Sequence, residues 1–173
     1  VPYLTNYYKN TIVGYSFSKS LSLPGERIGY LTIPGEIDDY HMVLSAANVA
    51  NRILGYVNAP SMFQIVVGKC IDEKTDIAYY DRNRETIYNG LKELGFECVK
   101  PEGAFYLFIK SPIEDEKEFC KLAKKYHILI VPGSSFGCAG FVRLAYCVSY
   151  ETIVNALPKF AELAAEIGLK PLK

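Results

Sequence analysis

The chain has 173 residues, half of them apolar, and its 19 basic and 19 acidic side chains give a formal net charge of zero. Nucleic acid and anionic membranes attract clusters of Lys and Arg, so this balance gives no reason to expect either as a partner. The apolar runs are interrupted by charge before the roughly 18 residues that a membrane-spanning helix needs. Five cysteines without C-x-x-C spacing predict reduced thiols in a cytoplasmic protein, and two histidines without paired spacing predict no metal site.

Near its amino end, the chain carries one lysine in an unusual setting. Residues 11–15 are mostly apolar or β-branched and predict a strand that leads to Ser16. The segment that follows is rich in Ser, Gly and Pro and predicts a loop rather than a continued strand. Lys19 therefore lies at a strand end between small hydroxyl residues, and Arg27 follows within the same loop.

The rest of the chain alternates helical and strand patterns. Residues 36–54 have apolar side chains at helical spacing after the Pro34-Gly35 turn, and two more helical patterns fill 61–93 around a polar join at 72–76. The remaining predictions are strands at 97–99 and 104–109, a helix at 114–126, strands at 128–131 and 141–148, and a final helix at 151–167. The predicted fold class is therefore α/β. Cys70, Cys98, Cys120 and Cys147 have apolar neighbours and are expected in the core.

The residues around Lys19 suggest covalent cofactor chemistry. A lysine amine, with an ordinary pKa of ~10.4, attacks an aldehyde only where neighbouring cations or desolvation lower that value. Arg27 supplies a cation, and its planar fork matches a phosphate dianion. The hydroxyls of Ser16 and Ser18 are short enough to donate to the same oxygens. An amine that captures an aldehyde beside phosphate-binding groups indicates pyridoxal 5'-phosphate, whereas a bare Ser-x-Ser-Lys would more simply be a solvated charge.

The whole run resembles a known signature. It is similar to the lysine segment of the class I/II aminotransferases, the aspartate aminotransferase-like branch of the fold-type I pyridoxal-phosphate enzymes. The positions that match are Ser16, Lys19, Ser22, Leu23, Gly25, Arg27 and Gly29. The resemblance implies that Lys19 is the catalytic residue that holds the cofactor, and that Ser16, Ser18 and Arg27 also bind it.

A second segment resembles the same family. Residues 131–137 and 140–146 are similar to the region whose arginine grips the substrate α-carboxylate, which implies that Arg143 binds substrate. Apart from the resemblance, a cation flanked by Val142 and Leu144 on a half-buried strand needs an anionic partner, because an isolated buried charge is costly. A structural salt bridge with a nearby Asp or Glu is the alternative.

The resemblance also implies a domain organisation. Residues 1–60 would be a remnant of the cofactor-binding large domain, and 61–173 an interdomain helix followed by an α+β carboxyl-terminal small domain. Family members are much longer and carry their lysine past the middle, so we expect this chain to be a carboxyl-terminal portion. Residues that contact the cofactor ring precede the lysine in the family. We therefore expect the portion alone to be inactive and to expose an apolar face.

The activity implied is that of a pyridoxal-phosphate-dependent aminotransferase, a cytoplasmic homodimer that moves an amino group between an amino acid and a 2-keto acid. A carbon-sulfur lyase shares the lysine, the arginines and the fold, and a non-catalytic aminotransferase-like domain of a transcription regulator is a further alternative. Two interpretations of Asn58 stay open, a contact with a neighbouring subunit's cofactor phosphate and an ordinary helix-breaking turn. Arg52 lies one residue from the second substrate arginine of dicarboxylate-specific members, so a preference for aspartate is not established.

Overall fold

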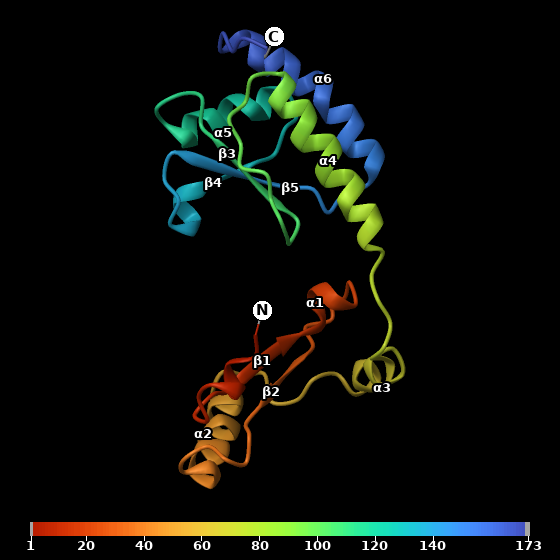
Figure 1. Cartoon of the computed structure of the whole chain (residues 1–173), viewed down its shortest axis with the longest axis vertical. Helices are drawn as coiled ribbons and strands as arrows, with labels where there is room; N and C mark the ends of the chain where they lie inside the picture. The colour runs from red at the N-terminus through yellow and green to blue at the C-terminus, as the bar shows by residue number, and fades with distance from the viewer. Residues whose placement is uncertain (1, 172–173) are drawn as a thin grey trace. The chain divides into compact units, whose positions relative to one another are not determined.

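The computed structural model describes residues 2–171, and its Cα positions divide the chain into two compact units between Thr75 and Asp76 (Figure 1). Each unit combines helices with antiparallel strands, which confirms the predicted mixture of helix and strand. The division expected at residue 60 concerns the domains of the parent enzyme and stays a prediction. Within the described range, no helix combines the length and the apolar character that crossing a membrane would require.

The first unit is built around a short hairpin. Strand β1 (Val13–Ser16) pairs antiparallel with β2 (Gly29–Thr32), and the single-turn helix α1 (Phe17–Ser20) lies between them in the chain. Helices α2 (Tyr40–Ile53) and α3 (Ser61–Lys69) follow, and η1 (Leu4–Asn6) precedes the hairpin. The sequence predicted a loop directly after β1. This prediction is wrong for the first four residues of that segment, because they form a helical turn.

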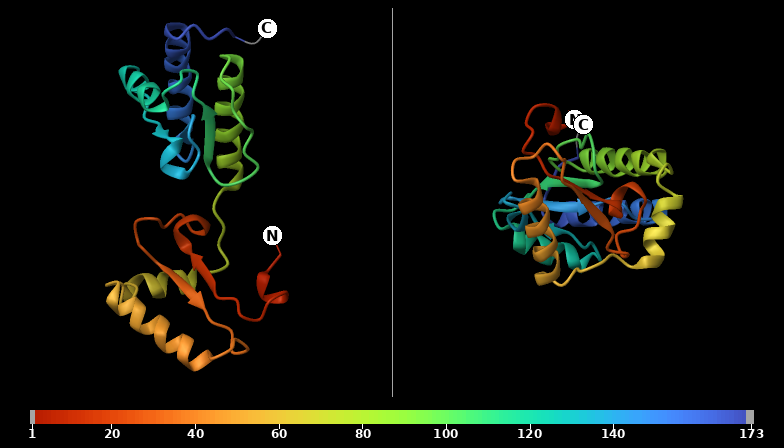
Figure 2. Two further views of the ribbon diagram at one scale, coloured as in Figure 1. Left: turned by 90° about the vertical axis from the view of Figure 1, so that its left-hand side faces the viewer. Right: turned by 90° about the horizontal axis from the view of Figure 1, so that it is seen from below.

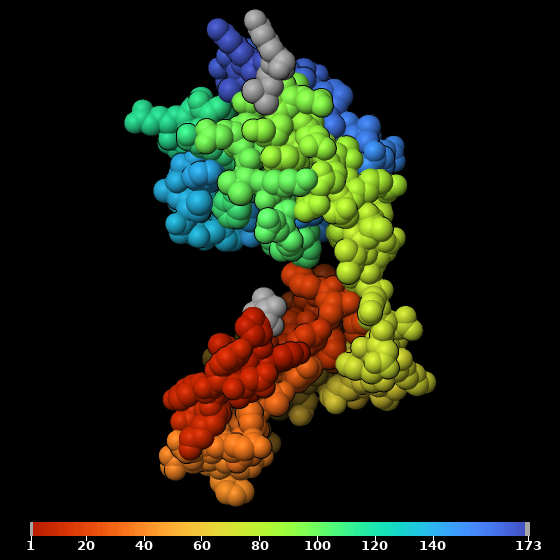
Figure 3. Space-filling model, viewed as in Figure 1, coloured from red at the N-terminus to blue at the C-terminus, as the bar shows by residue number. Residues whose placement is uncertain are grey.

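The first unit buries little of its apolar surface. Its core is a small cluster centred on Phe17, Ile28 and Val67. Most of the exposed large apolar side chains in the described part of the chain belong to this unit, whose red, orange and dark yellow atoms are seen from one side in Figure 3. These exposed side chains leave the unit with hydrophobic surface available for further contacts, and whether they form the single apolar face expected from the sequence stays a prediction.

The second unit is an antiparallel sheet covered on one face. Its strands lie in the order β3 (Tyr106–Lys110), β5 (Phe141–Ala145) and β4 (Val131–Pro132), and both pairings are antiparallel. Since successive strand residues point to opposite faces, Leu107 and Ile109 share one face with Val142 and Leu144, and all four are buried. These four side chains belong to the same core cluster as buried residues of the unit's three helices, α4 (Ile77–Glu93), α5 (Glu116–Lys125) and α6 (Tyr150–Glu166).

The helices of this unit are α4 (Ile77–Glu93), α5 (Glu116–Lys125) and α6 (Tyr150–Glu166). Helices α4 and α6 run side by side in Figures 1 and 2, and a Cβ at Gly90 of α4 would lie 2.4 Å from Leu157 Cδ2 of α6. The buried Asn83 of α4 donates from Nδ2 to the carbonyls of Tyr146 (3.0 Å) and Val148 (2.8 Å). These two bonds attach α4 to the residues that directly follow β5.

Several boundaries differ from the sequence predictions. Residues 97–99 are not a strand, because only an isolated bridge from Cys98 to Ile109 forms there. Helix α2 begins at Tyr40 rather than residue 36, after Asp39 in a left-handed conformation with φ of 54°. The expected core position of Cys147 is wrong, since that side chain is exposed, while Cys98 and Cys120 are buried as predicted and Cys70 is half-buried. Burial raises the pKa of the Cys98 thiol.

Replacing a core leucine tests the assignment of the second unit's core. Leu163 is fully buried, so Leu163→Ala should lower the free energy of unfolding by about 2–5 kcal/mol through lost burial and the cavity it leaves. Urea denaturation followed by circular dichroism measures the change. Leu129, which is 80% exposed, supplies the control, and Leu129→Ala should change stability by no more than about 0.5 kcal/mol. Equal losses in the two variants would contradict the assignment.

Candidate active site

The segment that carries Lys19 is a capped helical turn. The Ser16 side-chain oxygen accepts a hydrogen bond from the Ser18 backbone N–H (3.3 Å), which makes Ser16 the N-cap of α1. The Ser16 hydroxyl also donates to the Ser18 hydroxyl oxygen (3.0 Å). Ser16, Ser18 and Lys19 therefore lie within one helical turn, and the Lys19 side chain is exposed.

Arg27 returns to the same end of the hairpin. The Phe17 N–H donates to the Ile28 carbonyl (3.2 Å), and Ser16 pairs with Gly29 in the β1–β2 register. A Cβ on Gly29 would lie 2.4 Å from the Tyr15 carbonyl oxygen, so this close strand approach requires glycine. Arg27 itself has a left-handed backbone, with φ of 52°, and its Nη1 donates to the Pro24 carbonyl (2.9 Å). The backbone pairing thus places Arg27 next to the residues that flank α1.

The donor set of this turn suits a phosphorylated aldehyde. Two hydroxyls, a primary amine and a guanidinium lie at one end of the hairpin, and all of them can donate hydrogen bonds to phosphate oxygens. The Ser20 hydroxyl is buried and has no hydrogen-bond partner among the described residues, which leaves a further polar atom unsatisfied in the same turn. The residues present therefore fit pyridoxal phosphate.

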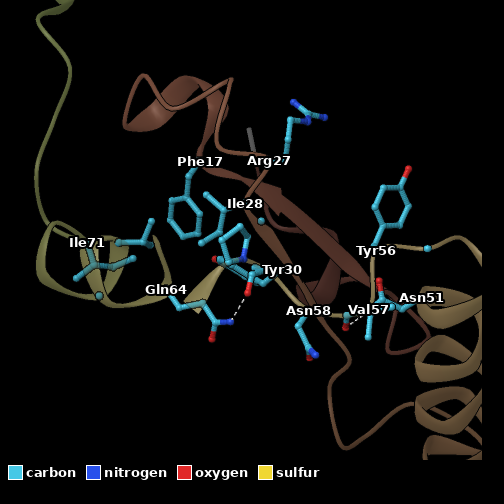
Figure 4. A pocket seen from close by; sticks show the side chains of 16 residues that line it. Phe17, Arg27, Ile28, Tyr30, Asn51, Tyr56, Val57, Asn58, Gln64 and Ile71 are labelled. Atoms are coloured by element: carbon cyan, nitrogen blue, oxygen red, sulfur yellow. Dashed lines mark hydrogen bonds between the residues drawn. The ribbon is translucent and has the colours of Figure 1, made fainter. Parts of the chain in front are cut away.

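An open cavity of about 850 Å³ lies beside this turn within the first unit (Figure 4). Arg27 and Asn58 both line it, whereas Ser16, Ser18, Lys19 and Arg52 do not. The segment that carries Asn58 is held at both ends, because Asn51 Nδ2 donates to the Val57 carbonyl (2.9 Å) and Gln64 Nε2 donates to the Ala59 carbonyl (2.7 Å); Figure 4 marks both bonds. The two roles suggested for Asn58 stay predictions.

Arg143 lies in the second unit, on the sheet face that the helices do not cover. It is opposite Phe108 on β3 and Val131 on β4, and its half-buried side chain points away from the core. Its guanidinium carbon lies 4.2 Å from the ring centroid of Tyr106 and 3.8 Å from that of Phe136. Aromatic faces attract a cation and leave its N–H edges for a planar anion.

The salt-bridge alternative for Arg143 finds no partner in the part of the chain that the structure describes, because no carboxylate lies within ion-pair distance of its guanidinium. A half-buried guanidinium that is stacked on two rings and unpaired within residues 2–171 retains hydrogen-bond donors for a ligand. This arrangement supports the carboxylate-binding interpretation of Arg143, whose role stays a prediction.

Sequence reasoning missed Glu116, the first residue of α5. Only 6% of Glu116 is exposed, and its carboxylate accepts hydrogen bonds from the backbone N–H groups of Ser134 (2.9 Å) and Gly140. A side-chain hydrogen bond from Ser134 and then the two backbone bonds lower the pKa of Glu116 below its ordinary value. The sequence held only a weak signal, an acidic residue inside the first helical turn.

Comparisons with known proteins agree with this geometry. A model of the family "Aminotransferase class I and II" matches residues 3–160. An aspartate aminotransferase of Pyrococcus abyssi is 31% identical over 170 residues, and an aromatic-amino-acid aminotransferase of Thermococcus litoralis is 30% identical over 170 residues. Each alignment covers 94% of this chain and 43% of the relative, so the chain spans less than half the length of these relatives.

Solved structures show the same fold. A crystal structure of an aminotransferase from Eubacterium rectale matches with a TM-score of 0.87 and 47% identity, covering 96% of this chain and 42% of that one. The aspartate aminotransferase of Thermus thermophilus with maleate matches with a TM-score of 0.72 and 25% identity, covering 88% and 41%. The described fold is therefore that of part of a fold-type I enzyme.

The Glu116 contacts predict a pH dependence of stability. A carboxyl whose pKa is lower in the folded state contributes stability above its unfolded pKa, about 4.3, and loses that contribution as the pH falls through the folded value. Wild type should therefore exceed Glu116→Gln in stability near pH 7, and the difference should shrink below about pH 4. Urea titrations across that range measure it. Glu118→Gln, at an exposed position of the same helix, should have the stability of wild type at each pH. A difference between wild type and Glu116→Gln that does not vary with pH would contradict this account.

Proposed function

The chain belongs to the class I and II aminotransferase family, and on that premise we propose that the full-length protein is a pyridoxal-phosphate-dependent aminotransferase. It transfers an amino group between an amino acid and a 2-keto acid. The observation that carries the proposal is the run from Ser16 to Gly29, which contains the residues that match the family signature. The run begins with the capped turn α1, and the β1–β2 pairing brings its two ends together.

Ser16, Ser18 and Arg27 are assigned to the cofactor phosphate. The two hydroxyls can reorient from each other toward phosphate oxygens, and Arg27 offers a bidentate fork. Lys19 would hold the cofactor covalently through Nζ, and its amine would act as the base and acid that moves a proton to or from Cα of the substrate. Bound pyridoxal phosphate supplies an electron sink for the bond cleaved at Cα.

Arg143 is assigned to the substrate α-carboxylate. Its guanidinium can donate two parallel hydrogen bonds to the two carboxylate oxygens. This pairing both strengthens substrate binding and fixes the orientation of Cα. Tyr106 and Phe136 stack on the guanidinium and restrict its plane, so its hydrogen-bonding edge keeps one orientation toward the carboxylate.

The remaining features of the whole protein are proposed from the family. We assign it to the cytoplasm as a homodimer, with Asn58 serving the neighbouring subunit's cofactor phosphate, and we expect the 173-residue chain alone to be inactive. The relatives named above are aminotransferases for aspartate and for aromatic amino acids, which favours amino transfer over carbon-sulfur lysis or a non-catalytic role. Those two names differ in the amino donor, so they do not select one for this protein.

Visible absorbance of the bound cofactor tests the role of Lys19. Full-length protein titrated with pyridoxal phosphate should develop an absorbance band that changes when an amino acid is added, and Lys19→Ala should abolish that band. Lys69→Ala, which removes an exposed lysine of the same unit, should retain it. A band of equal strength in the Lys19→Ala protein would refute the assignment.

Substituting Arg143 tests carboxylate binding. Arg143→Lys keeps the charge but loses the bidentate fork and the flat stacking surface, so kcat/KM for an amino donor should fall about a hundredfold. Arg82, which stacks 4.0 Å from the Tyr150 ring in the same unit, provides a matched control. Steady-state kinetics should show Arg82→Lys close to wild type, and similar losses in both variants would contradict a specific role for Arg143.

A further inference from the structure

Phe136, one of the two rings that flank Arg143, does not belong to the sheet. It lies in η2 (Gly133–Phe136), at the start of the loop that connects β4 to β5. The residue is 46% exposed, and its ring contacts Phe108 edge to face, with 6.4 Å between centroids. Tyr106 is fixed by the strand pairing of β3, but the position of Phe136 depends on how the 133–140 loop is held.

Glu116 holds that loop at both ends. Its two carboxylate oxygens accept from Ser134, inside η2, and from Gly140, the last residue before β5. The loop also closes on itself, because Cys138 N–H donates to the Gly133 carbonyl (2.9 Å). A Cβ at Gly133 would lie 2.2 Å from the Cys138 carbonyl oxygen, so the loop is tightly folded next to Ser134, where Glu116 binds it.

Helix α5 does not need the Glu116 carboxylate for its own start. Asp115 is the N-cap, and its side chain accepts from the N–H groups of Lys117 (2.7 Å) and Glu118 (3.4 Å). Among the described residues Glu116 forms no ion pair, so the loop N–H groups and the Ser134 hydroxyl are what offset the cost of burying its charge. The hydrogen bonds of this buried carboxylate go to the 133–140 loop, so its role is expected to lie in what that loop positions.

We propose that Glu116 is a positioning residue for the substrate-binding arginine: by clamping the loop at Ser134 and Gly140 it keeps the Phe136 ring on the Arg143 guanidinium. The inference rests on the carboxylate-binding role proposed for Arg143. Every amino acid substrate carries the same α-carboxylate, so loosening the loop weakens the binding of all donors by a similar factor. Ground-state and transition-state binding weaken together, so KM rises while kcat stays nearly constant.

The test uses the full-length, cofactor-loaded enzyme and compares Glu116→Gln with Glu118→Gln below the melting temperature of both. The glutamine amide would present a donor to one of the two loop N–H groups, so KM should rise about tenfold for alanine, aspartate and phenylalanine alike, with kcat within about twofold of wild type. Glu118→Gln should match wild type, because its carboxylate pairs with Lys121 at the surface and contacts neither Ser134 nor Gly140. Unchanged KM values in Glu116→Gln, or an effect on one donor alone, would overturn the proposal.

A second variant covers the case in which Glu116→Gln does not fold. Phe136→Leu removes the ring and leaves the Glu116 contacts intact, and it should raise KM for the same three donors in the same way. If Phe136→Leu leaves KM unchanged, the ring does not position Arg143 and the proposal fails.

A nuclear magnetic resonance measurement separates this proposal from the proposed function. The Nε–Hε resonance of Arg143 in the 173-residue chain should carry a ring-current shift from the two aromatic rings, and that shift should diminish in Glu116→Gln but not in Glu118→Gln. If wild-type enzyme transfers no amino group, the proposed function fails, and this resonance still decides whether Glu116 positions Arg143. No change of the resonance in Glu116→Gln would contradict the positioning role.

Discussion

The alternation of side chains along β5 is the constraint on which the second unit depends. Burying Val142 and Leu144 against the three helices forces Arg143 onto the opposite face, where the helices do not reach. A shift of register by one residue would bury the cation and expose the core. The hydrophobic core therefore also orients the guanidinium, and pairing with β3 brings Tyr106 beside it.

The first unit achieves its local order differently, with few buried contacts. Its Lys19 turn is held by the Ser16 cap and the backbone pairing of β1 with β2, and Gly29 allows the strands to approach closely enough for that pairing. Polar groups thus lie at one end of a hairpin whose apolar surface stays largely open. Short-range hydrogen bonds are sufficient to order the turn that carries Lys19 even where the core is small.

The predictability of each feature from sequence follows from the range of the interactions involved. Lys19 and Arg27 belong to a single local run, and the cap that organises it spans two residues, so the sequence pattern was informative there. The Glu116 contacts connect residues 18 and 24 positions apart, and no local pattern specifies them. The strand expected at 97–99 failed for a related reason, since strand formation depends on a partner, and only one bridge to Ile109 is made.

The central claim is that the full-length protein moves an amino group from one carbon skeleton to another by means of Lys19. The most direct measurement supplies an amino acid with isotopically labelled nitrogen, an unlabelled 2-keto acid and pyridoxal phosphate, and follows the label by mass spectrometry. The account predicts that the label reaches the newly formed amino acid, and that Lys19→Ala prevents this transfer. Label released as ammonia, or label that never leaves the donor, would contradict it.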